Sequence, residues 1–335
     1  MKQTLILALV AVANAVDINV YKYMNYLSQH NKSPGTLEEF NMRMRNFIAS
    51  DNFIEEWNAD PTNTHRVGHN FLSDWTAEEK AKLTQLGKGT TFENPRKDVP
   101  QHKADANFAA PASWNWTAQG VVPNVGNQQT CGDCYAWSAI GAVESSIAIA
   151  HNYTGTASST YLGNYFSVQQ PTSCSSAFGN NGCNGGWYYW VWEYMQTSPV
   201  VQAVFYPFTS GNGVTGTCAT ITNATAPFAQ TITTGTPYVQ VGRTNADIQN
   251  AIMVKPVSVA VEANLPAFQL YTSGVITKNC GTLVDHAILA VGWGTDPTYG
   301  PYWIVENSWG ASWGNNGYVL IGMSSTNAAG ICGIN

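Results

Sequence analysis

The chain has 335 residues, with 15 Lys and Arg against 21 Asp and Glu, which gives a formal net charge of −6 at neutral pH. This length allows two domains or one large domain, and the mild negative charge gives no reason to expect a nucleic-acid partner. No segment reaches the roughly 20 apolar residues that span a bilayer, so we expect a soluble product with no membrane partner.

The first 15 residues have the pattern of a secretory signal peptide. Lys2 supplies a positive start, residues 5–12 form a short apolar run, and Ala13-Asn14-Ala15 is a small-residue cleavage site. A buried N-terminal helix is the alternative, but it requires all three features to coincide. Secretion would place the cysteines where they pair and would permit glycosylation. Asn-x-Ser/Thr sequons begin at Asn31, Asn115, Asn152 and Asn223.

The composition changes near residue 110. Twelve of the 15 Lys and Arg precede this position, whereas all seven cysteines follow it. The bridging segment 94–103 lacks hydrophobic periodicity and is typical of an exposed linker. We therefore place a boundary between residues 97 and 111.

Two helices are predicted before this boundary. The first runs from Thr36 to Trp57, where apolar residues recur at steps of three and four with charges between them. These apolar residues are Leu37, Phe40, Met44, Phe47, Ile48 and Ile54. The second helix is predicted from Thr76 to Leu86. An ordinary helical hairpin packed on the larger part of the chain is the alternative interpretation.

The second part combines a helix with later strands, which predicts an α+β fold. Residues 138–150 form one apolar helix that follows directly on the loop containing Cys134. Strand patterns follow at four places, with Gly-rich turns between them. They are Val257–Val261, Ala287–Val291, Tyr302–Val305 and Tyr318–Ile321. A helix-rich half followed by a strand-rich half indicates two lobes with a cleft between them.

Cys134 is the cysteine that pairing would leave over from seven. A thiol attacks a carbonyl only as the thiolate, and a helix N-terminus and a nearby imidazole both lower a thiol pKa. Since Cys134 lies where the helix begins, we interpret it as a nucleophile. A zinc or redox motif at Cys131-x-x-Cys134 is the rival interpretation. It would require a second Cys or His pair at short spacing, or a preceding βαβ pattern, and neither is present.

Only two histidines follow residue 110. His151 is about 25 Å from Cys134 along the same predicted helix and lies beside a sequon, so we expect a solvated surface position. His286 begins an apolar strand, where an imidazole can be held over a cleft, although a structural histidine is the alternative. Asn307 is a candidate to orient that ring. Gln128 is a candidate oxyanion-hole donor beside the backbone N–H of Cys134.

Together these segments resemble the papain family of cysteine proteases. The resemblance extends from Pro111 to Cys332 and rests on Gln128 and on four separated motifs in order. These are Cys131-Gly-Asp-Cys-Tyr-Ala-Trp-Ser138, Gly182-Cys-Asn-Gly-Gly186, Asp285-His-Ala287 and Asn307-Ser-Trp-Gly310. It implies a papain-like fold with a helical lobe and a β-barrel-like lobe, with no metal or cofactor. It also implies Cys134 as nucleophile, His286 as acid and base, Asn307 as its orienter and Gln128 at the oxyanion hole.

The N-terminal part resembles the inhibitory propeptide of cathepsin L-like members of that family. The long helix carries Glu39, Arg43, Phe47, Ile54 and Asn58 at the family's spacing, with Ser50 where Asn is expected. Residues 68–74 resemble a second propeptide motif, with Leu72 where Phe is usual. The resemblance implies a signal peptide (1–15), a propeptide (16–109) that lies along the cleft as the enzyme's own inhibitor, and a peptidase domain (110–335), with processing near Ala109.

The family's pattern further implies the disulfides Cys131–Cys183, Cys174–Cys218 and Cys280–Cys332. Six cysteines allow fifteen pairings, so this connectivity comes from the resemblance alone.

The resemblance also implies the residues that bind substrate. The wall of the main specificity pocket would be apolar or aromatic, which predicts a bulky hydrophobic residue at P2, two residues before the scissile bond. The wall residues are Tyr188, Ala260, Val284 and Ala287, with Trp187 at the rim, and Gly185, Gly186, Asp285 and Trp309 complete the site. Ordinary core packing is the alternative for each wall residue. The chain stops three residues after Cys332, before the residues that close the pocket floor in relatives, so we expect an open floor that admits larger groups.

Asp133, directly before the nucleophile, departs from the family, which usually has a small residue there. Its carboxylate should disfavour a neighbouring thiolate by like-charge repulsion, although a solvent-facing carboxylate would be screened. The hypothesis is a modest rise in the thiol pKa or a preference for basic groups in a nearby subsite.

We expect a monomeric endopeptidase that acts on proteins or peptides in a lysosome, a digestive vacuole or the extracellular space. The adjacent histidine pair that caps the cleft of carboxydipeptidase relatives is absent. A non-catalytic glycoprotein on the same fold is the alternative, which loss of Cys134, His286 or Asn307 would favour. A third possibility is release of the intact N-terminal part as an inhibitor of other proteases.

Overall fold

The structure, a computed structural model, describes residues 18–87, 99–105, 107–152, 166–220 and 236–335. The predicted signal peptide and the sequon at Asn223 lie outside these residues. The helices are α1 (Ile18–Gln29), α2 (Leu37–Ala59), α3 (Ala77–Ala81), α4 (Cys134–Ala150), α6 (Gln169–Cys174), α7 (Tyr188–Thr197), α8 (Asn245–Val254) and α9 (Pro266–Gln269). The strands are β1 (His65–Val67), β2 (Trp114–Asn115), β3 (Val257–Val261), β4 (Tyr271–Ile276), β5 (His286–Asp296), β6 (Gly300–Glu306) and β7 (Tyr318–Gly322).

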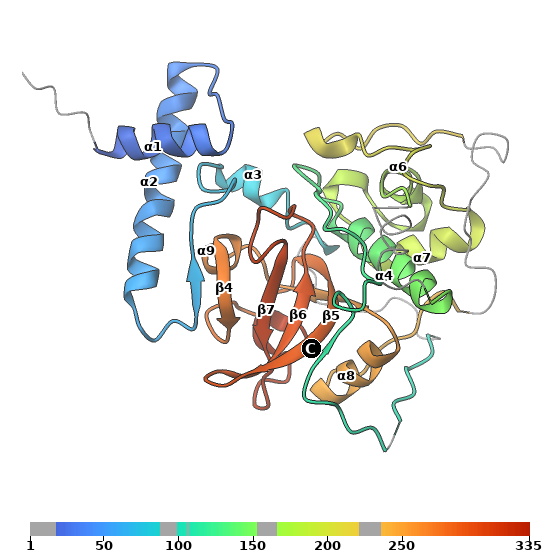
Figure 1. The fold of residues 1–335 in the computed structure, drawn as a ribbon. Coiled ribbons are helices and arrows are strands. Elements are labelled where there is room, and N and C mark those ends of the chain that lie inside the picture. Colours follow the sequence, from blue (N-terminus) through green and yellow to red (C-terminus); the bar gives the residue numbers. More distant parts are fainter. Residues whose placement is uncertain (1–17, 88–98, 106, 153–165, 221–235) are drawn as a thin grey trace, which may run out of the picture.

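Residues 18–87, here called the N-terminal segment, form a helical unit in which α1 crosses α2 (Figure 1). Thr36 caps α2 by accepting a hydrogen bond from the backbone N–H of Glu39, a typical role for threonine at a helix start. Tyr23, Tyr26 and Phe47 pack together with ring centroids 5.0 to 6.0 Å apart. The helix predicted over 36–57 is therefore present, with Phe47 buried against α1 and with Phe40, Met44 and Ile48 partly buried there, whereas Leu37 is exposed.

The N-terminal segment is attached to the rest of the chain by backbone pairing. Its strand β1 pairs antiparallel with β4. Asn58 holds β1 in place because its Nδ2 donates to Val67 O at 2.8 Å while its Oδ1 accepts from Val67 N at 3.2 Å. Asn70 Nδ2 donates to Gln269 O at 2.8 Å. The segment thus extends the sheet of the larger part rather than resting loosely on its surface.

The strands follow the order β1-β4-β7-β6-β5-β2, and β3 also pairs with β5. The pairs are antiparallel except for β4 with β7. Among the described residues the sheet does not close on itself, so the lobe expected to be barrel-like is an open sheet. All four predicted strands are present, and β3 has the predicted bounds.

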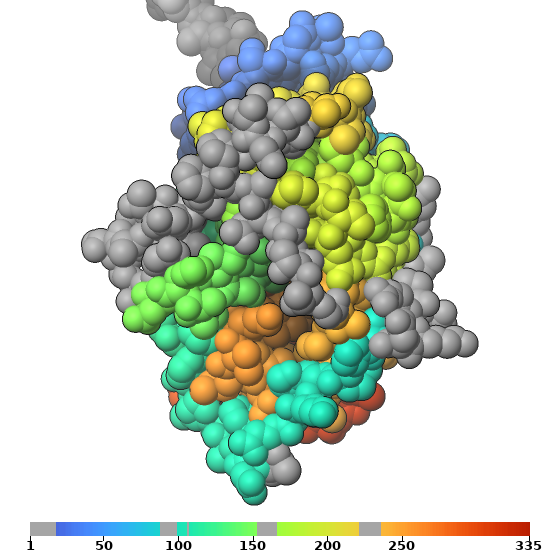
Figure 2. Space-filling model, turned by 90° about the vertical axis from the view of Figure 1, so that its right-hand side faces the viewer, coloured from blue at the N-terminus to red at the C-terminus, as the bar shows by residue number. Residues whose placement is uncertain are grey.

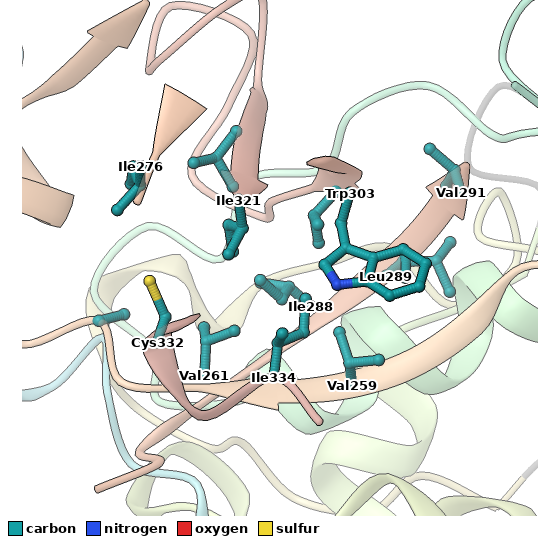
Figure 3. Packing of buried hydrophobic residues seen from close by; sticks show 14 of the residues in the cluster. Val259, Val261, Ile276, Ile288, Leu289, Val291, Trp303, Ile321, Cys332 and Ile334 are labelled. Carbon is teal, nitrogen blue, oxygen red and sulfur yellow. The ribbon is translucent and has the colours of Figure 1, made fainter. Parts of the chain in front are cut away.

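The main hydrophobic core lies against this sheet. Figure 3 shows Val259 and Val261 of β3, Ile288 of β5 and Trp303 of β6 in one buried cluster. Their partners across the strands are fixed by the register, which places Val259 opposite Ile288. Branched and aromatic side chains suit such a half-buried pleated surface, and their burial contributes most of the stability of this lobe.

The second lobe is helical and is built around α4, which packs between β5 and α7 (Figure 1). Two disulfides join its loops, Cys131–Cys183 and Cys174–Cys218, while Cys280–Cys332 lies in the sheet lobe. This is the connectivity that the resemblance implies. Each disulfide typically adds about 2–4 kcal/mol to the free energy of unfolding, because it restricts the unfolded chain. Figure 2 shows the helical lobe between the N-terminal segment above and the orange residues of the α8 region below.

Some helices differ from the sequence predictions. The helix predicted over 76–86 is observed only over Ala77–Ala81, because residues 83–87 leave the helix to pair with the larger part of the chain. Helices α1, α6, α7, α8 and α9 were not predicted. Among the described residues, no helix combines the length and apolar character needed to cross a membrane.

The aromatic core of the N-terminal segment gives a first prediction. Phe47 is 2 % exposed, and Phe47→Ala should cost about 3–5 kcal/mol of packing, which exceeds what so small a unit can lose. Limited proteolysis should therefore cleave the segment much faster in this variant than in the unchanged chain. Leu37→Ala is the matched control, since Leu37 is 75 % exposed and should leave the rate unchanged. Equal cleavage of all three proteins would contradict the prediction.

Candidate active site

Cys134 is the first residue of α4 and the one free cysteine among the described residues. The seven-cysteine chain therefore leaves this thiol unpaired, at a helix N-terminus where a thiolate is favoured. It is fully buried here, however, and burial raises the pKa of the thiol to about 12. The backbone N–H of Ala287 opposes this rise, whereas the charges of Asp133 and Asp285 add to it. In this state the thiol is neutral.

His286 begins β5 and is fully buried. Its Nε2 lies 2.7 Å from Asn307 Oδ1, and that oxygen also accepts a hydrogen bond from the backbone N–H of Ser308. Because Oδ1 can only accept, Nε2 must donate, which leaves Nδ1 free to act as a base. Burial lowers the pKa of the imidazole to about 4, although Asn307 and the carbonyl of Leu83 oppose the shift. The ring is therefore neutral as well.

Trp309 covers the imidazole. Its ring centroid lies 4.9 Å from that of His286, and the indole is 1 % exposed. The indole thus keeps water from the hydrogen bond between His286 and Asn307. His151, by contrast, is exposed at the far end of α4, as the sequence predicts.

Gln128 lies beside these groups with its side chain fixed at both ends. Its Oε1 accepts from Ser308 Oγ at 2.7 Å, and its Nε2 donates to Cys131 O at 2.8 Å. The same Nε2 donates to Leu83 O at 3.1 Å. The carbonyl oxygen of Leu83 therefore lies against the Gln128 amide, the predicted oxyanion-hole donor.

The N-terminal segment crosses the site between the two lobes. The backbone N–H of Leu86 donates to Asp285 O at 2.9 Å, and that of Gly87 donates to Gly186 O at 3.3 Å. Residues 86 and 87 thus hydrogen-bond to one residue of each lobe. Both acceptors belong to the predicted substrate site.

A glycine is required at position 185 by this contact. Gly185 has a φ of +107°, and a Cβ there would lie 2.0 Å from Gln85 O. The backbone of the N-terminal segment approaches so closely that no larger residue fits.

Three of the predicted wall residues line one cavity. A cavity of about 730 Å³ is lined by Tyr188, Ala260 and Val284. Ala287 joins Tyr188 in a buried cluster that also includes Leu86 of the N-terminal segment, which is fully buried. Trp187, expected at the rim, is 4 % exposed because the backbone at Gly87 covers its ring.

The structure corrects the expectation for Asp133. Its carboxyl is fully buried, and Thr172 Oγ1 lies 2.8 Å from Oδ2. Solvent therefore does not screen its charge in the intact chain. The preference for basic groups in a nearby subsite stays a prediction.

Sequence reasoning gave no role to Ser308, although it stands inside the motif that contains Asn307. Its hydroxyl ties the predicted oxyanion donor to the loop that orients the histidine. Leu83 and Leu86 were also missed, since an apolar helix pattern does not reveal that the chain leaves the helix to cross a cleft. Among the described residues, no group of three His, Cys, Asp or Glu is placed to hold a metal ion.

Comparisons with known proteins show the families to which the two parts of the chain belong. Residues 110–335 match the family model for papain family cysteine proteases, and residues 23–79 match that for the cathepsin propeptide inhibitor domain (I29). The cysteine proteinase RD21A of Arabidopsis thaliana is 31 % identical, over 98 % of this chain and 72 % of its own length. Digestive cysteine proteinase 3 of Homarus americanus is 33 % identical, over 92 % and 91 %.

Two solved precursors have a similar structure over nearly the whole chain. A recombinant stem bromelain precursor superposes with a TM-score of 0.79 at 30 % identity, covering 95 % of this chain and 96 % of its own. The digestive procathepsin L2 proteinase of Tenebrio molitor larval midgut gives a TM-score of 0.78 at 29 % identity, covering 94 % and 97 %.

The burial of both reactive groups gives a second prediction. In the intact chain at about pH 7, iodoacetamide should alkylate Cys134 at least ~100-fold more slowly than after the N-terminal segment has been removed, because only the thiolate reacts. The measurement is the rate of label incorporation at Cys134 by mass spectrometry. Cys134→Ser should take up no label, since the other six cysteines are paired. Similar rates before and after removal would show that the segment does not control the thiol.

Proposed function

Because this chain belongs to the papain family of cysteine proteases, we propose that it is an endopeptidase with Cys134 as its nucleophile and His286 as its acid and base. It is a zymogen whose inhibitory propeptide is the N-terminal segment. The observation that carries the residue assignment is the hydrogen bond of 2.7 Å between His286 Nε2 and Asn307 Oδ1, together with the bond from Gln128 Nε2 to the carbonyl of Leu83. The division we propose is a signal peptide over 1–15, a propeptide over 16–109 and a peptidase domain over 110–335.

Removal of the propeptide would create the reactive ion pair. Water entering the cleft lowers the pKa of the Cys134 thiol and raises that of the His286 imidazole, because it solvates both charged forms. The thiol proton then moves to His286 Nδ1, which the bond from Nε2 to Asn307 leaves free. A neutral amide is a suitable partner at Nε2, since the thiolate and the imidazolium already balance each other.

The catalytic cycle then follows from these positions. The Cys134 thiolate attacks the peptide carbonyl carbon, and the resulting oxyanion accepts hydrogen bonds from Gln128 Nε2 and the backbone N–H of Cys134. The His286 imidazolium protonates the leaving amine, which departs and leaves a thioester on Cys134. Water, deprotonated by His286, attacks the thioester, and the carboxylic acid product leaves with regeneration of the thiolate.

The direction of the propeptide explains why it is not cut. Along a substrate chain, the P2 residue that fills the pocket comes earlier than the residue whose scissile carbonyl lies in the oxyanion hole. In the propeptide the order is reversed, since Leu83 faces Gln128 and the later Leu86 is buried with Tyr188 and Ala287. A chain of reversed polarity presents its carbonyl without the correct leaving-group geometry.

Leu86 also supports a hydrophobic P2 preference. The propeptide places an aliphatic side chain among the residues predicted to form the pocket wall, and the adjoining cavity of about 730 Å³ leaves room for larger groups. We therefore propose Leu, Phe and larger apolar residues at P2.

We also propose a cellular route and an oligomeric state. The signal-like first 15 residues and relatives named as digestive proteinases support entry into the secretory pathway, with a lysosomal, vacuolar or extracellular destination. The two lobes supply every residue of the proposed site, so a monomer suffices.

The central test is covalent labelling. A thiol-directed epoxide of the E-64 type, the inhibitor bound in a solved bromelain protease 34 % identical to this chain, should label the activated enzyme stoichiometrically at Cys134. Peptide mapping should find no label in Cys134→Ser. No label on the activated enzyme, or label at another residue, would overturn the proposed function.

The P2 proposal is tested with fluorogenic peptides that differ only at P2. Leu and Phe should exceed Ala and Arg in kcat/KM by at least ~10-fold, which is the range that burial of an apolar side chain provides. Ala260→Phe narrows the pocket and should reduce kcat/KM for P2 Phe more than for P2 Val. A flat P2 profile would exclude this pocket as the source of specificity.

A further inference from the structure

The buried carboxyl of Asp133 is a titratable group that the proposed mechanism does not use. It immediately precedes Cys134, and its exposed fraction is zero. An aspartate at this position ordinarily caps a helix by accepting hydrogen bonds from the first backbone N–H groups, but Asp133 makes no side-chain cap bond with α4. Capping therefore does not explain its presence.

The hydrogen bonds around Asp133 favour a protonated carboxyl. Thr172 Oγ1 lies 2.8 Å from Asp133 Oδ2 and 2.8 Å from Val168 O. The hydroxyl has one proton, and the carbonyl can only accept it. Thr172 must therefore divide its one proton between Val168 O and Asp133 Oδ2, which leaves an ionised Asp133 with at most a shared hydrogen bond.

Ionisation would break this arrangement. Thr172 would have to turn its proton to the carboxylate, and the second oxygen, Asp133 Oδ1, has no hydrogen-bond partner among the described residues. The indole N–H of Trp137, one turn along α4, makes no hydrogen bond with the described residues, so it offsets the burial of the anion only partly. A buried carboxylate with one unpaired oxygen is strongly disfavoured. Burial accordingly raises the pKa of this carboxyl to about 7.

The charges facing this carboxyl can be named. On α4 it faces the Cys134 thiol and the Tyr135 phenol, and from α6 it meets only the neutral Thr172. Asp285, just before β5, faces the same thiol from the other lobe, with a pKa that burial also raises to about 7. The contacts of Asp133 come from the peptidase domain, so they persist when the propeptide leaves.

We propose that Asp133 restricts the peptidase to acidic conditions by acting through Cys134. The neutral carboxyl leaves the thiolate undisturbed in acid, and its ionisation at higher pH places a second, unscreened negative charge beside the thiolate at the same helix end. The thiolate then recovers its proton from the His286 imidazolium, and both groups become neutral and unreactive. Asp133 thus acts through the protonation state of Cys134 and does not itself contact the substrate. This inference rests on the proposed function.

The test is a pH profile of kcat/KM for enzyme activated from the full chain with an added acid protease. For the unchanged enzyme we expect a descending step near neutral pH. In Asp133→Asn this step should be smaller, so that the ratio of kcat/KM at about pH 8 to that at about pH 5 rises about fivefold. The ratio cancels any general loss of activity. The thiolate absorbance in the ultraviolet at about pH 7.5 should be greater in the variant.

Two further variants identify the group responsible. Thr172→Val removes the hydroxyl that stabilises the carboxylate, so the step should move to higher pH. Asp285→Asn should retain the step. Profiles of Asp133→Asn that superimpose on those of the unchanged enzyme would overturn the inference, as would a step that survives in Asp133→Asn and vanishes in Asp285→Asn. Epoxide labelling of Cys134 separates these outcomes from failure of the proposed function, since an unlabelled enzyme overturns both.

A stability measurement keeps the inference testable if activity is lost. Asp133 has a folded-state pKa above its unfolded value, so its stabilising effect is complete below about pH 4 and disappears as pH rises through about 7. The comparison uses the inactive Cys134→Ser full chain with and without the added substitution Asp133→Asn. Over this pH range the melting temperature should fall by several degrees more in the chain that retains Asp133. Parallel melting curves would contradict the buried ionisation.

Discussion

Exclusion of water from Cys134 and His286 is the constraint on which this molecule depends. Both side chains have zero exposure beneath residues 83–87, and both charged forms are disfavoured there, since burial raises the pKa of the thiol and lowers that of the imidazole. A reactive thiolate–imidazolium pair and a bound propeptide therefore exclude each other. The chain can fold with its site assembled and remain inert, because assembly needs only the neutral groups.

Maintaining that exclusion requires anchors far from the cleft. The propeptide contributes β1 to the edge strand β4, and Arg43 holds α3 against α2 through two bonds to Glu79 at 2.9 and 3.1 Å. These contacts hold the chain in place just before residues 83–87. Binding of Leu83 and Leu86 at the site therefore costs little additional conformational entropy. Removal of the propeptide consequently exposes the edge of β4, whose unpaired backbone groups can form hydrogen bonds with other strands.

The sequence predicted those parts whose pattern is local. Helix α2, strand β3 and the helix beginning near Cys134 follow from periodicity, and the single suitable histidine followed from elimination. Helix α7 was missed because its run of Tyr and Trp suits strands as well as helices, and α3 ended early because its last residues gain more by pairing across the cleft than by continuing the helix. The burial of Asp133 could not be predicted, since it depends on Thr172, nearly forty positions away and on another helix.

Carboxyl groups in the two parts of the zymogen respond to acid in opposite directions. In the propeptide the Arg43 guanidinium lowers the pKa of Glu39. Arg43 also lowers the pKa of Glu79, because its hydrogen bonds to that carboxylate outweigh the effect of burial. Stability from these groups is present above their unfolded pKa and is lost as pH falls. In the peptidase domain burial raises the pKa of Asp285 to about 7 and that of Glu306 to about 8, so their stabilising effect grows as pH falls. Through these four groups acid weakens the propeptide while it stabilises the peptidase domain, and the neutral form of Asp133 belongs to the same acidic state.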